Sequence, residues 1–186
     1  MCGIVGIVDA GGVSIQLYYA LYALQHRGQE SAGISTFDGT SLHKFKGSGL
    51  VADVFSPSVL SDLKGNAGVG HVRYPTTGSN LPENIQPLNF QFQDHLISIA
   101  HNGNLVNTPT IRAEYEKEGQ IFTTTTDTEV IAKILMDEIG RSGIVEDAVH
   151  VCMQKIQGSY SVVLMIDGII YAFRDPLGIK PFCIGR

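Results

Sequence analysis

The stretch MCGIVGIV, residues 1–8, determines how the fold of this chain begins. Glycine and β-branched residues dominate positions 2–8, which predicts a buried β-strand. Cys2 stands directly in front of that run, at a chain end that normally frays unless it is tied down. A strand over 3–8 would anchor Cys2 in a sheet. A cysteine there is either the apolar start of the strand or a reactive group, and this stretch alone favours the apolar start.

The bulk composition describes a folded chain with a sizeable core. The chain has 186 residues, of which 44% are hydrophobic and 17% charged, so we expect one globular domain. The net charge is −5, and the lysines and arginines are scattered without a basic stripe, which disfavours binding to nucleic acid or to a membrane surface. The longest apolar runs, such as 161–166, are too short to span a membrane.

The number and spacing of the cysteines and histidines further narrow the class of protein. Cys2, Cys152 and Cys183 are too few and too dispersed for a disulfide framework, and we interpret Cys152 and Cys183 as core residues. The histidines show no metal-ligand spacing, so no metal site is expected. No signal-peptide pattern opens the chain, and a reducing cytoplasm is the expected compartment.

Hydrophobic periodicity predicts the secondary structure. Two Asp-Gly pairs, at 38–39 and 167–168, predict hairpin turns. Residues 74–90 contain three prolines and no periodicity, which predicts a long loop of the kind that often forms a lid. The tally predicts an α+β fold with two sheets covered by helices. We expect strands at 2–8, 32–36, 41–45, 67–73, 95–101, 159–166 and 169–175, and helices at 14–25, 126–139 and 143–156.

Cys2 gains a second function if Met1 is removed. Its thiol and a free α-amino group would then share one Cα. That amine has a pKa of about 7.7–8.0 in model peptides, so it can take the thiol proton directly or through one water. A thiolate nucleophile would form without a separate histidine.

Other residues could complete such a site. Asn102 and Gly103, expected at a turn where the strand at 95–101 ends, offer a side-chain amide and a backbone N–H to an oxyanion, although Asn-Gly is also an ordinary turn. Arg73 could grip a carboxylate or be a surface residue. Asp127 could bind an ammonium or stabilise its own helix.

The polar stretch QHRGQESAG, residues 25–33, follows the first predicted helix. Arg27 and Gly28 could shape the wall of a site, or they could cap the helix, and the two interpretations are compatible. His71 and His101 lie in predicted strands, where histidines are more often packed or hydrogen-bonded than catalytic.

Seven ordered stretches together resemble the class II glutamine amidotransferases: MCGIVGI, LQHRGQESAGI, GHVRYPTTG, AHNGNLVN, TDTEVI, GSYSVVLM and RDPLGIKP. They run from residue 2 to about residue 182, almost the whole chain. Within the class, HRGQESAG, Tyr74 after Arg73 and the absence of tryptophan are most similar to the glutaminase half of the amidophosphoribosyltransferases.

The resemblance implies an N-terminal-nucleophile hydrolase fold, a four-layer αββα sandwich of two antiparallel sheets flanked by helices. It implies that Cys2 is the catalytic nucleophile once Met1 is lost. Asn102 and Gly103 match the oxyanion hole, and Arg27 with Gly28 match the turn beside the nucleophile.

The resemblance also implies how substrate is held. Arg73 and Asp127 match the groups that bind the carboxylate and the amine of glutamine. Thr76 matches a contact in the loop that closes over glutamine.

The implied function is enzymatic: hydrolysis of glutamine to glutamate and ammonia, which serves phosphoribosylamine formation in the first step of de novo purine synthesis. We expect residues 1–186 to form one glutaminase domain, truncated at its C-terminal end and without the phosphoribosyltransferase domain. No cofactor is expected here, whereas Mg²⁺ and phosphoribosyl pyrophosphate would belong to the absent domain. A homo-oligomer is expected for the full-length protein.

Three alternatives stay open from the sequence. Cys2 could use His71 or His101 as its base. The domain could serve a different synthase, one that forms glutamate or an aminosugar. The pocket could bind glutamine without turnover, although a pure binder needs no nucleophile.

Overall fold

The computed structural model describes residues 1–74 and 81–186, and these residues form two compact units. The first unit contains Met1–Asn102 and Val162–Ala172, and the second contains Gly103–Ser161 and Phe173–Arg186. Strands β6, β7 and β8 contribute residues to both units. That residues 1–186 form one glutaminase domain stays a prediction.

The first sheet lies entirely in the first unit, with strand order β1-β4-β2-β3. Its strands are all antiparallel, and they confirm the strands predicted at 2–8, 32–36, 41–45 and 67–73. Strand β4 is central and fully buried, because its alternation of glycine and apolar residues lets it pack on both faces. Their bounds are β1 Gly3–Val8, β2 Ser31–Phe37, β3 Leu42–Ser48 and β4 Ala67–Arg73.

Strand β1 corrects one expectation. It was predicted to be buried, but only Gly3 in it is fully buried, since β1 is an edge strand with a single neighbour. Gly6 of β1 faces the second sheet within the same unit, where a Cβ would press on Val163 and Ile170. The N-terminus is therefore tied into a sheet along one side only, where β1 pairs with β4. In this pairing Gly3 lies opposite Val72.

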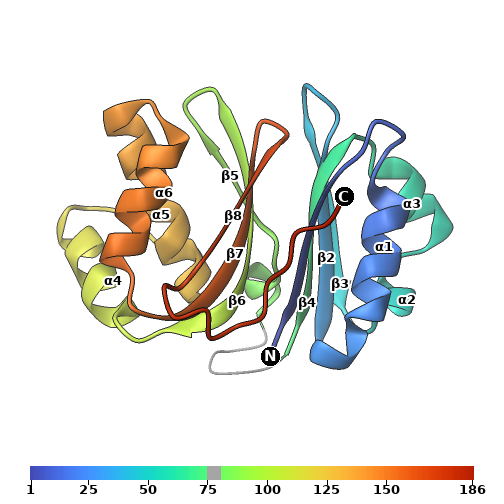
Figure 1. Cartoon of the computed structure of the whole chain (residues 1–186), viewed down its shortest axis with the longest axis horizontal. Helices are drawn as coiled ribbons and strands as arrows, with labels where there is room; N and C mark the ends of the chain where they lie inside the picture. Colours follow the sequence, from blue (N-terminus) through green and yellow to red (C-terminus); the bar gives the residue numbers. More distant parts are fainter. Residues whose placement is uncertain (75–80) are drawn as a thin grey trace. The chain divides into compact units, whose positions relative to one another are not determined.

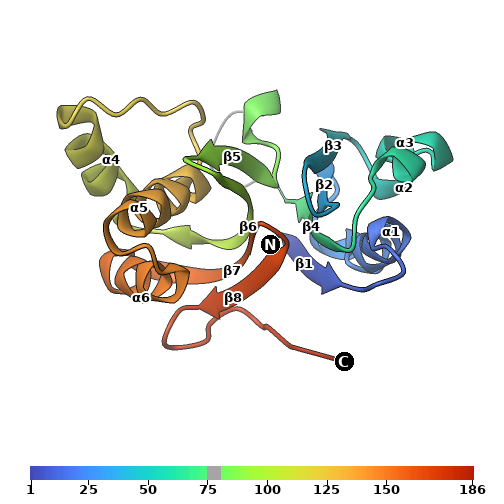
Figure 2. The ribbon, with the colours of Figure 1, turned by 90° about the horizontal axis from the view of Figure 1, so that it is seen from above.

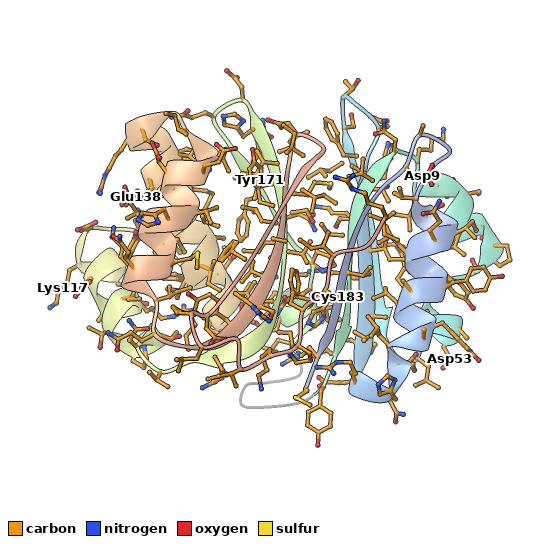
Figure 3. All side chains as sticks on the ribbon, in the orientation of Figure 1. Asp9, Asp53, Lys117, Glu138, Tyr171 and Cys183 are labelled. Atoms are coloured by element: carbon orange, nitrogen blue, oxygen red, sulfur yellow. The ribbon has the colours of Figure 1, made fainter. Side chains whose placement is uncertain are left out.

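Helices α1, α2 and α3 cover one face of the first sheet (Figures 1 and 2). Leu17 and Leu21 of α1 are fully buried against Ala32, Ile34 and Val72, as their spacing of four residues predicts. Side chains fill the space between these helices and the sheet (Figure 3). The elements are α1 Ser14–Ala23, the 3₁₀ turn η1 Gln25–Arg27, α2 Val51–Val54 and α3 Pro57–Asp62.

The second sheet has strand order β5-β6-β7-β8. Its strands are β5 Leu88–Phe92, β6 His95–Leu105, β7 Gly158–Ile166 and β8 Ile169–Arg174. The predicted loop at 74–90 is wrong over 82–84, a 3₁₀ turn (η2, Pro82–Asn84), and over 88–90, which starts β5. Pairing with β6 makes this stretch a strand, in which the apolar Leu88, Phe90 and Phe92 alternate with the polar Asn89 and Gln91. Residues 75–80 of that predicted lid lie outside the described residues.

Both predicted hairpins are present, but only the second has a two-residue turn. Asp167 and Gly168 both have positive φ, 49° and 84°, as a two-residue type I′ connection requires. Asp38 opens a four-residue loop instead, and its carboxylate accepts hydrogen bonds from the N–H groups of Thr40 and Ser41.

The second unit contains α4 Thr108–Lys117, α5 Asp127–Ser142 and α6 Val145–Lys155. The Thr126 side chain caps α5 by accepting from the Glu129 N–H, as the capping-box spacing predicts. The Glu129 carboxylate does not reach back to Thr126. It is buried and accepts from Thr123 and Thr124 in the preceding loop. Helix α4 has no counterpart in the predicted elements.

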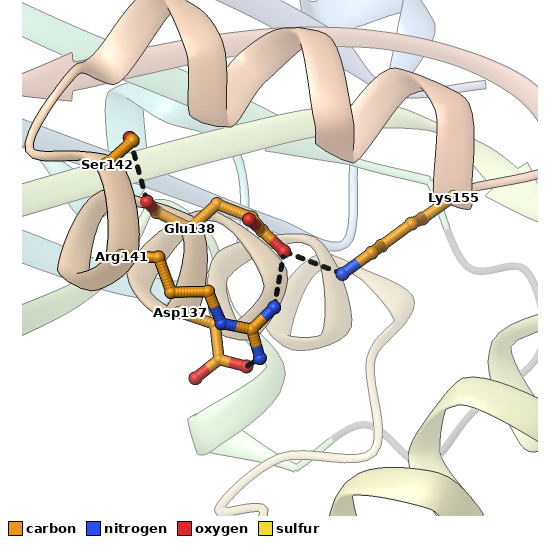
Figure 4. A network of polar contacts seen from close by, with 5 residues as sticks. All are labelled: Asp137, Glu138, Arg141, Ser142 and Lys155. Atoms are coloured by element: carbon orange, nitrogen blue, oxygen red, sulfur yellow. Dashed lines mark hydrogen bonds and ion pairs between the residues drawn. The ribbon is translucent and has the colours of Figure 1, made fainter.

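Charged side chains join α5 to α6 (Figure 4). Lys155 Nζ lies 2.7 Å from Glu138 Oε1, and Arg141 bridges Glu138 and Asp137. The partly exposed lysine lowers the pKa of the Glu138 carboxyl by hydrogen bonding to it. Taken together, the elements confirm the α+β class with two antiparallel sheets flanked by helices. In the described part of the chain, no helix is long and apolar enough to cross a membrane.

Candidate active site

Cys2 and Asn102 are joined by a hydrogen bond. The backbone N–H of Cys2 donates to Oδ1 of Asn102 over 3.2 Å, and both residues belong to the first unit. Asn102 is buried, and with Oδ1 accepting, its Nδ2 is the group of that amide that can donate elsewhere. The contact therefore places a side-chain amide donor beside the residue predicted to be the nucleophile.

Asn102 and Gly103 do not form the predicted turn. Both lie inside β6, which continues to Leu105, and neither has a positive φ. The dipeptide Asn-Gly favours a turn locally, but pairing in the sheet overrides that preference. The two residues are therefore held by a strand rather than by a loop.

Arg27 holds the other end of Cys2. Its Nε donates to the Cys2 carbonyl oxygen over 3.0 Å, from the short η1 turn that follows α1. Gln25 fixes that turn, because its amide donates to the carbonyl of Gly28 and accepts from the N–H of Val51. The backbone of Cys2 is thus gripped at its nitrogen and at its oxygen by side chains distant in sequence.

Gly28 lies against the end of β4. A Cβ at this position would come 2.5 Å from the carbonyl carbon of Arg73 and 2.7 Å from the carbonyl oxygen of Val72. The φ of Gly28 is −166°, an extended conformation that any residue can adopt. Glycine is required at this position only because a side chain would not fit. Gly28 therefore caps η1 and also allows the turn to pack directly on the backbone of Arg73.

Arg73 is buried and faces Glu30, a residue that the sequence analysis did not single out. Arg73 Nη1 lies 3.4 Å from Glu30 Oε1, and the Glu30 N–H donates to the Arg73 carbonyl. Among the described residues, neither Arg73 Nη1 nor Glu30 Oε2 has a hydrogen-bond partner. A guanidinium with a buried donor of this kind suits the binding of a carboxylate.

Asp127 lies at the first position of α5, in the second unit. Its Oδ2 accepts from the backbone N–H of Leu105 over 3.1 Å, so the carboxylate joins the start of α5 to the end of β6. Thr76, the remaining predicted substrate contact, lies outside the described residues.

His71 and His101 are both buried, as expected for packed histidines. Burial lowers the pKa of His71 to about 3, helped by the nearby His101 and Arg73. The backbone N–H of His101 donates to Oε1 of Gln86 over 2.7 Å. Gln86 carries no local signal in the sequence, since it lies in a stretch without periodicity.

The other two cysteines differ in burial. Cys152 is buried as predicted, and burial raises the pKa of its thiol to about 12. Cys183 is exposed, so its prediction as a core residue is wrong; it lies in the irregular stretch after the last strand. Within residues 1–74 and 81–186, no cluster of three or more histidine, cysteine, aspartate or glutamate side chains could hold a metal ion.

Comparison with known proteins gives one consistent result. Residues 71–186 match a family model described as "Glutamine amidotransferase domain". The chain is 50% identical to the amidophosphoribosyltransferase of Methanothermobacter thermautotrophicus over 188 aligned residues, covering 100% of this chain and 40% of that protein. It is 41% identical to the Bacillus subtilis amidophosphoribosyltransferase, covering 99% of this chain and 38% of the relative.

Two solved structures agree with these relatives. One, described as the allosteric regulatory enzyme of purine biosynthesis, matches 97% of this chain and 38% of its own length with a TM-score of 0.89 and 39% identity. The B. subtilis glutamine phosphoribosylpyrophosphate amidotransferase, complexed with ADP and GMP, matches with a TM-score of 0.81 and the same identity and coverage. These matches confirm the expected N-terminal-nucleophile hydrolase fold.

The chain spans about 40% of the length of the curated relatives that it matches. The family model covers more than half of the chain, including Arg73, Asn102, Gly103 and Asp127. The chain belongs to the glutamine amidotransferase domain family.

Proposed function

We propose that this domain hydrolyses glutamine to glutamate and ammonia, with Cys2 as the nucleophile. The observation that carries the proposal is the hydrogen bond between the Cys2 nitrogen and Asn102 Oδ1. It brings together the residue whose amine and thiol would act and an amide that would stabilise the oxyanion.

The first half of the reaction begins after the Met1–Cys2 peptide bond is hydrolysed. The free amine of Cys2 accepts the thiol proton, and Sγ attacks the side-chain amide carbon of glutamine. Negative charge develops on the amide oxygen, where Asn102 Nδ2 and the N–H of Gly103 donate to it. The amine returns its proton to the leaving nitrogen, and ammonia departs as a γ-glutamyl thioester forms.

The second half restores the enzyme. Water attacks the thioester carbon and gives a proton to the Cys2 amine, and the same two donors stabilise the second oxyanion. Cys2 Sγ then leaves and regains that proton from the amine as glutamate is released. Arg27 keeps the Cys2 carbonyl in place throughout. Arg73 binds the α-carboxylate of glutamine, Asp127 binds its α-ammonium group, and Thr76 contacts the substrate.

We further propose that the ammonia is used to make phosphoribosylamine from phosphoribosyl pyrophosphate in purine synthesis. The names of the relatives, amidophosphoribosyltransferases at 50% and 47% identity, support this acceptor. The synthase step and its Mg²⁺ would belong to a phosphoribosyltransferase domain, and the glutaminase step needs no cofactor. The proposed compartment is the cytoplasm, and the proposed assembly of the whole protein is a homo-oligomer.

The histidine alternative is weaker on physical grounds. A base must accept a proton near neutral pH, whereas burial holds the pKa of His71 at about 3. The geometry also disfavours a pure glutamine binder, since Asn102 and Arg27 both hold Cys2 and binding alone requires no such grip.

The test compares three forms of the chain. Mass spectrometry establishes whether Met1 is absent, and glutamate release is measured for the wild type, for Cys2→Ala and for a variant with lysine inserted between Met1 and Cys2. We expect activity only in the wild type without Met1. Equal activity in the form with a blocked amine would exclude the amine as the base.

The acceptor is tested separately. The wild type and Cys2→Ala are each assayed, in the protein as its gene encodes it, for phosphoribosylamine formation with glutamine and with free ammonia. We expect Cys2→Ala to abolish the glutamine-dependent reaction and to spare the ammonia-dependent one. Absence of both reactions in an active glutaminase would point to a different synthase.

A further inference from the structure

We propose that Gln86 is a positioning residue that sets Asn102 at the right distance from Cys2. The inference deepens the proposed glutaminase reaction and rests on it. It concerns only residues of the first unit, which contains Gln86, His101, Asn102 and Cys2.

The pairing of β5 with β6 ends before β6 itself ends. The antiparallel register between these strands ends at Leu88, opposite Ile99, yet β6 continues to Leu105. Extending the register by two positions would place Gln86 opposite His101. No backbone of β5 covers that part of β6, because the ladder has already ended.

The Gln86 side chain supplies the missing hydrogen bond. Its Oε1 accepts from the His101 N–H over 2.7 Å, in a contact where both residues are buried. A side-chain amide here replaces a strand partner and satisfies a buried backbone N–H. The next residue along β6 is Asn102, so this bond is one residue from the proposed oxyanion donor.

Gln86 is itself held by the first sheet. Lys46 of β3 donates to the carbonyl of Ile85, and burial lowers the pKa of this lysine. The Gln86 carbonyl oxygen lies so close to Gly33 of β2 that a Cβ at position 33 would overlap it.

A third connection lies just beyond Gln86. Ser35 Oγ of β2 donates to Asn89 Oδ1 over 2.8 Å, and Asn89 Nδ2 donates to the Pro87 carbonyl over 3.1 Å. The segment 85–89 is therefore fastened to β2 and β3 at successive positions.

These contacts form one continuous route between the two proposed groups. Cys2 precedes β1, which pairs with β4, and β4 pairs with β2. From β2 the route runs through Gly33 to Gln86, and from Gln86 to His101 and Asn102. Because an active-site group displaced by about 1 Å can cost about 100-fold in rate, this route matters for turnover.

The first experiment removes the side-chain amide of Gln86, and with it the hydrogen bond to His101. Gln86→Met keeps the length and approximate volume of the side chain but has no strong acceptor. We expect kcat for glutamate release to fall about 10- to 100-fold with less than a threefold change in KM, since the oxyanion exists only after attack. Gln86→Glu retains an acceptor and is expected to recover most of kcat. Gln91→Met, on the exposed side of β5, is the matched control and should behave as wild type.

The second experiment moves Gln86 without changing it. Gly33→Ala introduces a Cβ against the Gln86 carbonyl and is expected to lower kcat in the same way. Gly47→Ala on the neighbouring strand β3 places its Cβ in ordinary contact, 3.4 Å from Val54, and should leave kcat unchanged.

A structural measurement keeps the inference separate from the proposed reaction. Backbone hydrogen exchange at His101 and the NMR signals of the Asn102 side-chain amide are recorded for each variant. Faster exchange and shifted amide signals in Gln86→Met, but not in Gln91→Met, support the positioning role. This holds even if the wild type releases no glutamate, because the lack of glutamate release rejects only the proposed reaction. Unchanged exchange and amide signals, or an unchanged kcat in an active enzyme, overturn the positioning role.

Discussion

The Cys2 nitrogen and Asn102 Oδ1 lie 3.2 Å apart, although 100 positions separate the two residues in the chain. The bond orients the asparagine amide, since Oδ1 is engaged and Nδ2 is left to donate. It also connects a residue at the edge of one sheet to a strand of the other. Four predictions follow from this relationship and from the residues around it.

Asn102→Ala should lower kcat for glutamate release by about 100-fold or more, because one oxyanion donor is lost. KM for glutamine should change little, since the donor acts mainly on the transition state. Steady-state kinetics of glutamate release measure both constants. Asn104→Ala, at an exposed position two residues further along β6, is the control. Similar kcat values for the two variants would contradict the role of Asn102.

Gly28→Ala should lower the free energy of unfolding by about 1–3 kcal/mol, because the added Cβ overlaps the backbone of Val72 and Arg73. It should also raise KM for glutamine by displacing Arg73. Urea denaturation and steady-state kinetics test the two effects. Gly11→Ala serves as the comparison, since its Cβ meets only Asp9 at 3.4 Å. Equal stability of the two variants would show that the turn can shift without cost.

Arg73→Met should destabilise the folded state by about 3 kcal/mol, because it leaves the largely buried carboxylate of Glu30 without its partner. Adding Glu30→Gln to that variant should restore part of the loss. A double-mutant cycle in urea measures the coupling between the two residues. Arg141→Met, which removes an exposed arginine from its surface ion pairs, should have little effect. No recovery in the double variant would mean that the 3.4 Å pair is not coupled.

His71 should make folding sensitive to acid. Its imidazole has an ordinary pKa of 6.5, and in the folded protein burial lowers the pKa to about 3. The unfolded chain therefore binds an extra proton between these pH values, and the free energy of unfolding falls as the pH falls. The slope from this group approaches about 1.4 kcal/mol per pH unit.

The measurement is urea denaturation at pH 7, 6 and 5 for the wild type, for His71→Gln and for His150→Gln on the exposed side of α6. The wild type and His150→Gln should lose stability more steeply than His71→Gln as the pH falls. Parallel curves for all three proteins would show that His71 takes up its proton without unfolding.

Local sequence patterns were sufficient to predict many of the helices and strands. The alternation of glycine and apolar residues predicts β4, the leucine spacing predicts α1, and Asp167-Gly168 predicts the hairpin of β7 and β8. These features arise from backbone preferences and from one buried face, and both are properties of neighbouring residues. The same reasoning fails for α4 and for the Asn102–Gly103 pair. In those places a neighbouring strand or the packing of the second unit decides the conformation.

The candidate site shows the same division. The chemical types were readable from the sequence, because an N-terminal cysteine, an amide, a guanidinium and a carboxylate each suggest a role. Glu30 and Gln86 were not readable, since each acts through a contact with a residue at least 15 positions away. Sequence spacing carries no signal for a contact that depends on how strands are paired.

The sequence by itself determined the strand that anchors Cys2, the order of most helices and strands, and the set of reactive groups. Only the tertiary structure decided that the Cys2 nitrogen meets Asn102, that Arg27 holds the Cys2 carbonyl, and that Gln86 completes the edge of β6. The physical reason is the distance along the chain over which each kind of interaction acts. Backbone propensity and periodicity act over a few residues, whereas a catalytic constellation requires hydrogen bonds between segments that come together only when the sheets form.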